Sequence, residues 1–244
     1  MNSNKFIFLL FTLIFLTTCG KDDSVNCECE KLPNADFTIS QGLGWNEDRR
    51  YFESDTFLDY EIKVEAINTL SSYNWTLGLD PSSWDSKSVE LDFTDNFGDI
   101  EVTLIGEWTP NNDCFPNDNG MDTVSKTFHI VSVWESLFLG NYSGFCESTP
   151  NEIFNISIKL DSNGLIGWIE NLPNGCNTEE WDLLIGGSTY KHFLMPDYIP
   201  GIPCSLPKGF GSLGDDNKTL TIEYEIWDQA TNTKISDKFI GTKI

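Results

Sequence analysis

The chain has 244 residues and is strongly acidic, because 38 Asp and Glu residues outnumber 15 Lys and Arg residues and give a net charge of −23 at pH 7. Such a surface repels the phosphate backbone of nucleic acids, so we expect no nucleic-acid partner. The chain is also 39% hydrophobic and 13% aromatic, a content that allows one or two packed cores.

A basic residue near the N-terminus, Lys5, is followed by the apolar run of residues 6–16. A membrane-spanning helix needs about 20 apolar residues, so this run is too short to span. It leads directly into Leu16-Thr17-Thr18-Cys19-Gly20. This arrangement resembles a bacterial lipoprotein signal, although Thr18 stands where that family prefers Ala, Gly or Ser. The alternative is an ordinary secretory signal.

The resemblance implies that residues 1–18 are a signal peptide, that cleavage precedes Cys19, and that Cys19 carries the lipid. Residues 19–34 then form the lipidated cysteine and a tether. The tether begins Gly20-Lys21-Asp22-Asp23-Ser24, which is similar to the short acidic run that directs some gram-negative lipoproteins to the cell surface. We therefore expect a lipid-anchored protein of the outer membrane, exposed on the cell surface, whose contact with the membrane is the lipid alone.

Six cysteines remain once Cys19 is lipidated, and the cell envelope is oxidising, so an even number indicates disulfides. Cys114 is expected to pair with one of the first two cysteines, and one pair is expected among the last three. Which cysteines pair is left open. The disulfide candidates are Cys27, Cys29, Cys114, Cys146, Cys176 and Cys204.

Residues 35–133 alternate between apolar and polar residues over several short runs that turn residues separate, a pattern that predicts half-buried strands. The expected strands are residues 60–66, 73–77, 89–93, 100–104 and 128–130. The segments YNWTLG at 73–78, VELDF at 89–93 and GDIEVTL at 98–104 resemble a PKD-like module of the immunoglobulin fold. The usual Gly-Asp-Gly turn of that family is replaced here by Gly78-Leu79-Asp80-Pro81. The resemblance implies an antiparallel β-sandwich that acts as a spacer or a binding unit.

Residues 134–244 carry a second series of short strands, and the whole chain is therefore predicted to be all-β. The expected strands are residues 140–146, 153–160, 164–170, 181–187, 188–194, 208–213, 220–227 and 234–242. Eight consecutive strands with short connections favour an up-and-down antiparallel barrel. LGNYSG at 139–144 resembles the Gly-x-Tyr start of lipocalin-like barrels. A second β-sandwich is the alternative.

Catalytic motifs are missing from the sequence: it contains no serine nucleophile elbow, no HExxH and no phosphate-binding glycine loop. The two histidines, His129 and His192, each lie on an expected strand, and we expect His129 to point to solvent. A hydrolase would need two carboxylates on one pocket wall, and the adjacent acidic pairs in this chain are typical of solvated turns. We therefore expect no enzymatic activity and no cofactor.

Calcium is the one metal that the sequence suggests. Asp113, Asp118 and Asp122 crowd one segment around Gly120, and calcium prefers six to eight hard oxygen ligands. The segment does not follow the EF-hand spacing, and Asp and Asn are also the ordinary residues of turns.

Aromatic residues are frequent in the second half of the chain and are the candidate ligand-binding residues there, because stacked rings hold sugars and apolar ligands. They are Trp168, Trp181, Tyr190, Phe193, Tyr198, Phe210 and Trp227. We expect a non-enzymatic binding or scaffold protein with a protein or glycan partner. The alternative is a lipocalin-like carrier of a small apolar or sugar ligand.

Overall fold

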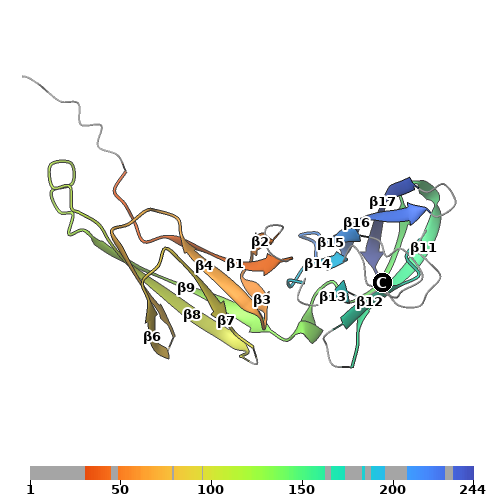
Figure 1. Ribbon diagram of the computed structural model, residues 1–244, viewed down its shortest axis with the longest axis horizontal. Helices are drawn as coiled ribbons and strands as arrows, with labels where there is room; N and C mark the ends of the chain where they lie inside the picture. The colour runs from red at the N-terminus through yellow and green to blue at the C-terminus, as the bar shows by residue number, and fades with distance from the viewer. Residues whose placement is uncertain are drawn as a thin grey trace, which may run out of the picture.

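The computed structural model describes residues 31–44, 49–78, 80–94, 96–162, 166–173, 183–184, 188–195, 208–228 and 233–244. Apart from one short 3-10 turn, η2 (Val133–Glu135), all regular elements in these ranges are strands (Figure 1). The prediction of an all-β protein is therefore confirmed. The predicted signal peptide, Cys19 and most of the tether lie outside the described residues. In the part that is described, no helix is long and apolar enough to cross a membrane.

The first part of the chain forms two facing sheets, which we call the N-terminal sheet pair. Their orders are β2-β1-β4-β7 and β3-β9-β8-β5-β6, and all strand pairs are antiparallel except β3 with β9. The strands are β1 (Phe37–Leu43), β2 (Arg50–Glu53), β3 (Thr56–Leu58), β4 (Glu61–Ala66), β5 (Ser72–Leu77), β6 (Asp80–Trp84), β7 (Ser88–Asp92), β8 (Gly98–Glu107) and β9 (Met121–Val131).

The strands expected from alternation at 60–66, 73–77, 89–93, 100–104 and 128–130 correspond to β4, β5, β7, β8 and β9. Alternation did not identify β1, β2, β3 and β6. In β1 the reason is Gln41, a polar residue that is 1% exposed. Its side-chain amide donates to the Leu58 carbonyl and accepts from the Leu58 N–H. Gln41 therefore serves as a polar bridge between the two sheets, which breaks the apolar pattern.

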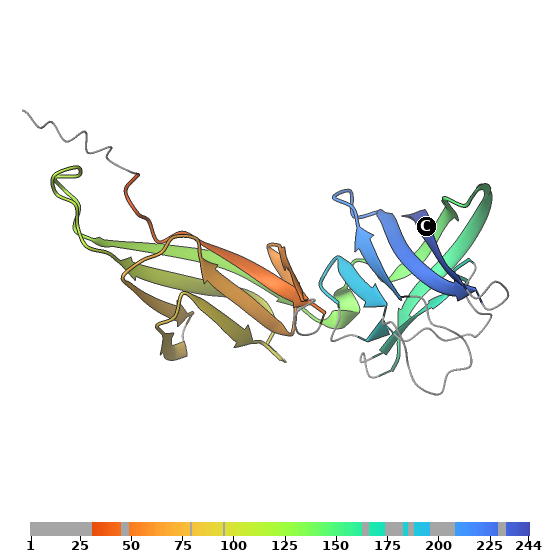
Figure 2. The ribbon, with the colours of Figure 1, turned by 45° about the horizontal axis from the view of Figure 1, so that its top comes forward.

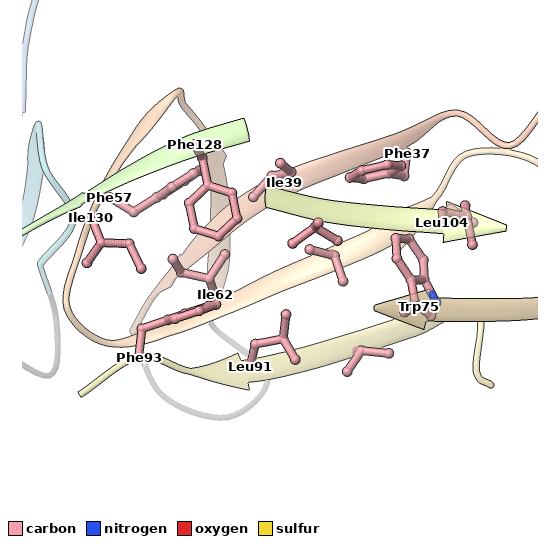
Figure 3. Packing of buried hydrophobic residues seen from close by; sticks show 14 of the residues in the cluster. Phe37, Ile39, Phe57, Ile62, Trp75, Leu91, Phe93, Leu104, Phe128 and Ile130 are labelled. Atoms are coloured by element: carbon pink, nitrogen blue, oxygen red, sulfur yellow. The ribbon is translucent and has the colours of Figure 1, made fainter. Parts of the chain in front are cut away.

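Side chains from both sheets meet in one core (Figure 3). The rings of Phe37 and Trp75 pack edge to face at 5.1 Å, and Phe128 packs edge to face against Phe57 and Phe93. The Trp75 Nε1–H, which is buried with its ring, donates to the Ser86 carbonyl at 2.7 Å. Edge-to-face rings add to the burial of apolar area, so these aromatics hold the two sheets together.

The second part of the chain forms one eight-stranded sheet with the order β13-β12-β11-β10-β17-β16-β15-β14. Figure 2 shows that this sheet curls into a half-barrel, and we call it the curled sheet. Its strands are β10 (Gly140–Cys146), β11 (Thr149–Leu160), β12 (Ile166–Glu170), β13 (Leu183–Leu184), β14 (His192–Met195), β15 (Lys208–Leu213), β16 (Thr219–Asp228) and β17 (Thr233–Lys243).

Strands that follow one another in the chain pair in the curled sheet, with one exception: β13 does not pair with β14, and these two strands are the edges of the sheet. The first strand, β10, pairs with the last strand, β17. Gly144 permits the close approach of β10 and β17, because a Cβ there would collide with the Ile240 carbonyl oxygen. The eight expected strands all correspond to observed ones, although β13 and β14 are shorter than predicted.

The concave side of the curled sheet is packed with its own side chains. Tyr142 and Phe239 are completely buried there, and the Tyr142 hydroxyl donates to the Phe138 carbonyl at 2.8 Å. The residues of this core are Phe138, Tyr142, Cys146, Ile156, Ile158, Ile169, Leu172, Phe193, Met195, Leu213, Leu220, Ile222, Tyr224 and Phe239.

Candidate functional site: the junction between the two parts

Four of the aromatic residues predicted to bind a ligand are described by the structure, and these four do not all lie in one place. Phe193 is a core residue whose ring packs against Phe138 at 5.1 Å. Trp168 lies half-buried beside the buried Ile169, and its Nε1–H donates to Glu170. Tyr190 and Phe210 lie at the junction described below. Trp181, Tyr198 and the side chain of Trp227 lie outside the described residues. Phe193 thus lies in the core and Tyr190 and Phe210 at the junction, and the aromatic-lined ligand site stays a prediction.

The predicted calcium ligands are not brought together either. Asp118 accepts hydrogen bonds from Trp108 Nε1 and from the backbone N–H groups of Asn111 and Gly120. These bonds hold the loop between β8 and β9 and keep the pKa of the Asp118 carboxyl below its ordinary value, although its desolvation acts the other way. Asp122 accepts from the backbone N–H groups of Ala35 and Thr123.

Asp113 is exposed on the same loop. Across the described ranges, no three His, Cys, Asp or Glu side chains form a group that would hold a metal ion. Asp118 and Asp122 accept hydrogen bonds from backbone N–H groups of the chain itself, and the calcium site at Asp113, Asp118 and Asp122 stays a prediction.

The cysteine predictions have mixed outcomes. Cys114 is disulfide-bonded, and no disulfide joins two of the described cysteines. Cys146 is a free, buried thiol, so the prediction that it takes part in a disulfide is wrong. Cys27, Cys29, Cys176 and Cys204 lie outside the described residues, and the choice of partner for Cys114 stays a prediction.

Cys146 belongs to a buried polar cluster at the end of β10. Its sulfur lies 3.4 Å from the Tyr224 hydroxyl, which donates to the Pro173 carbonyl at 3.0 Å and lies 3.4 Å from Asp237 Oδ2. The Asp237 carboxylate also accepts from the hydroxyl of Ser148 at 2.6 Å. Burial raises the pKa of the Cys146 thiol, and the nearby Asp237 charge adds to this effect. A thiol that stays protonated is a poor nucleophile, so this cluster has a structural role.

The two parts of the protein meet through a stack of three rings. Phe52 on β2 lies 4.1 Å from the ring of His192 on β14, with an interplanar angle of 25°. The same phenyl ring lies 5.9 Å from Phe210 on β15, and the His192 and Phe210 rings are 5.8 Å apart. Arg50 lies over the opposing Phe210 ring at 5.7 Å. Phe52 of the N-terminal sheet pair thus contacts two neighbouring strands of the curled sheet, β14 and β15.

His192 is held in this stack as a neutral ring. Its Nδ1 lies 2.9 Å from the Thr189 hydroxyl. Burial, together with the charge of the neighbouring Lys191, lowers the pKa of His192 from 6.5 to about 4. At neutral pH the ring therefore packs as an uncharged aromatic group, which suits a stack between phenyl rings.

A second, apolar contact supports the junction. Leu58, Val131 and Val133 are buried together, and Tyr60, Leu160 and Tyr190 pack against them. The Leu137 N–H, just before the curled sheet, donates to the Tyr190 carbonyl at 3.0 Å. Burial raises the pKa of Tyr60 to about 12. The segment that connects the two parts, residues 132–139, is thus packed against both of them.

The other histidine has a different environment. His129 is exposed on β9, as predicted, and its Nδ1 lies 2.7 Å from Asp99 Oδ1. Sequence reasoning did not single out Phe52, which the structure places at the centre of the junction. The available signal was a large aromatic residue within the short, mostly exposed segment RYFE.

No protein-family model matches this chain, and no curated protein matches it. The features described above therefore define the protein by its architecture: an all-β chain in which an N-terminal sheet pair is joined to a curled half-barrel sheet by a stacked aromatic junction.

Proposed function

We propose that the protein is a surface-exposed, lipid-anchored protein of the outer membrane that binds a protein or glycan partner without catalysing a reaction. In this proposal Cys19 carries the lipid, the N-terminal sheet pair is a PKD-like spacer, and the curled sheet presents the contact surface. The observation that carries the proposal is the position of the chain entry relative to the junction.

The chain enters the N-terminal sheet pair at the end farthest from the junction. The Ala35 N–H donates to Asp122 at the start of β9, whereas Val131 at the end of β9 packs into the junction. β9 has 11 residues, so these ends are separated by roughly 35 Å at the usual strand rise. A tether that reaches Ala35 would therefore leave the curled sheet on the far side from the lipid.

The far end of the curled sheet is the side that a partner would meet first. β10 leaves the junction at Gly140 and ends at Cys146, and β11 returns to the junction at Leu160. Ile153, near the far end of β11, is 67% exposed. Ile153 therefore marks the far end of the curled sheet with a solvent-accessible side chain at which contact with a partner can be probed.

Photo-crosslinking on intact cells tests this proposal. A photoreactive amino acid replaces Ile153 at the far end or, as the matched control, the exposed Asn112 in the loop between β8 and β9. We expect adducts of defined mass from position 153 and few from position 112. Adducts from neither position, or from position 112 alone, would contradict the proposed contact surface.

The anchor is tested separately. Replacing Cys19 with Ala should abolish lipid labelling and remove the protein from the membrane fraction in detergent partitioning. Continued membrane association of the variant would refute the lipoprotein assignment, whatever the result of the crosslinking.

A lipocalin-like carrier of a small apolar or sugar ligand is the second candidate function, and the curl of the C-terminal sheet favours it. The buried side chains on the concave face weigh against it, because they occupy the space that a ligand would need. Native mass spectrometry of protein purified from its own host decides between the two: a co-purifying small mass supports the carrier, and an apo mass supports the scaffold.

A further inference from the structure

The junction contains a histidine, His192, and the ordinary pKa of a histidine lies between neutral and mildly acidic pH. We propose that the stack of Phe52, His192 and Phe210 is an acid-sensitive joint, which holds the N-terminal sheet pair against the curled sheet at neutral pH and loosens when His192 gains a proton. The proposal does not depend on the identity of the partner or on the lipid anchor.

The surroundings of the joint favour a neutral imidazole. The ring is stacked at 4.1 Å on Phe52 and its Nδ1 is directed to the Thr189 hydroxyl. In the described structure no carboxylate is hydrogen-bonded to the ring, so a proton gained there would lack a compensating anion. A cation buried in such surroundings costs more than a cation in water.

The charges around the ring also disfavour protonation. Lys191 precedes His192 on β14, Arg50 reaches over from β2, and Lys208 lies on β15 with Phe210. The one carboxylate on these strands close to the stack in sequence is Glu53, which follows Phe52. Attraction between a cation and a phenyl ring would favour the charged form, but the Phe210 face already has Arg50 above it.

Thermodynamic linkage gives the direction and the range of the effect. In the packed joint, burial lowers the pKa of His192 from 6.5 to about 4, whereas a separated joint would expose the ring and restore its ordinary pKa. The separated form therefore binds more protons between these two values. The N-terminal sheet pair is therefore held most strongly against the curled sheet above pH 6.5. The equilibrium constant for this docking falls by about tenfold per pH unit as the pH falls from the ordinary pKa of His192 toward its lowered pKa.

The histidine titration measures this coupling directly. The chain has only two histidines, so NMR of the mature full-length chain resolves both rings, and His129 serves as the internal reference. We expect His192 to stay neutral at pH 5.5 in the wild type and to titrate near its ordinary value in Phe52→Ala. Identical titration of His192 in the two proteins would overturn the proposal.

A distance measurement tests the opening itself. Dyes attached through noncanonical amino acids at Asn112 and Glu152 report the separation of the two ends by energy transfer at pH 7.5 and pH 5. We expect a broader distance distribution at pH 5 in the wild type and in His129→Gln, and no pH response in His192→Phe, which cannot be protonated. An equal pH response in His192→Phe would assign the effect to the carboxylates and overturn the proposal.

Discussion

Replacing Gln41 with Glu tests how the two N-terminal sheets are joined. Gln41 is 1% exposed and bridges to Leu58 with both ends of its amide, at 3.0 Å to the carbonyl and 3.2 Å to the N–H. The substitution keeps the size of the side chain and replaces the donor nitrogen with an oxygen. The carboxylate would still accept from the Leu58 N–H, but its second oxygen would face the Leu58 carbonyl without a proton between them.

The magnitude follows from the partners that remain. The Leu58 carbonyl also accepts from the Tyr60 N–H at 2.8 Å, so it keeps one hydrogen bond, and the main cost is a buried negative charge whose second oxygen has no donor. Breaking a hydrogen bond of this kind costs about 1 kcal/mol, and leaving a buried polar group unsatisfied costs about 1–3 kcal/mol more. We therefore expect Gln41→Glu to unfold with a free energy lower by about 2–4 kcal/mol at pH 7.

The stability of Gln41→Glu should also depend on pH, which gives a second, independent test. Burial raises the pKa of a carboxyl at this position, and the protonated acid can again donate to the Leu58 carbonyl. The destabilisation of Gln41→Glu relative to wild type should shrink as the pH falls. Urea denaturation at pH 7 and pH 5, followed by circular dichroism, measures both effects. The exposed Asn74→Asp is the matched control, with little expected change. A cost below about 0.5 kcal/mol, or one that grows at pH 5, would refute the assigned role.

Three further predictions concern glycine and cysteine. Gly144→Ala should destabilise the curled sheet by about 1–3 kcal/mol in urea denaturation, because the new Cβ would collide with the Ile240 carbonyl on β17; unchanged stability would show that this seam is looser than described. Cys146 should resist maleimide labelling in the native protein and react fully in urea, because it is buried and its thiol pKa is raised; rapid native labelling would contradict this. Peptide mapping without reduction should link Cys114 to the peptide containing residues 27–29, and a link to any other peptide would disprove that pairing.

The sequence was most informative where burial follows a simple period. In the curled sheet each strand has one face in the core, so apolar residues recur at every second position. Tyr142 and Cys146 on β10, and Leu220 and Ile222 on β16, alternate in this way. Most of the strand order followed because short connections favour pairing between neighbours in the chain, but β13 and β14 lie at opposite edges of an open half-barrel and do not pair. The alternation of apolar residues also predicted β4, β5 and β7. It did not predict β1, because the buried Gln41 interrupts the apolar pattern of that strand.

Sites are harder to predict from sequence than strands, because a site depends on which side chains meet across the fold. The aromatic residues of the second half look alike in the sequence, but Phe193 lies in the core and Phe210 lies at the junction. Asp118 has the chemistry of a calcium ligand, yet its oxygens accept hydrogen bonds from its own loop. Residue type alone does not distinguish these outcomes, since each was decided by partners distant in the chain or by the local turn.

Charge, turn residues and the period of two are local properties, so they can be read from the residues alone, and they showed an acidic, all-β chain with two series of strands. The stacking of Phe52 on His192 and the free, buried thiol of Cys146 became apparent from the packed fold. These contacts join residues more than 70 positions apart in the chain, for example Cys146 and Tyr224, which are separated by 78 positions. Such contacts depend on how the packed sheets bring distant strands together, and no pattern within one strand records that.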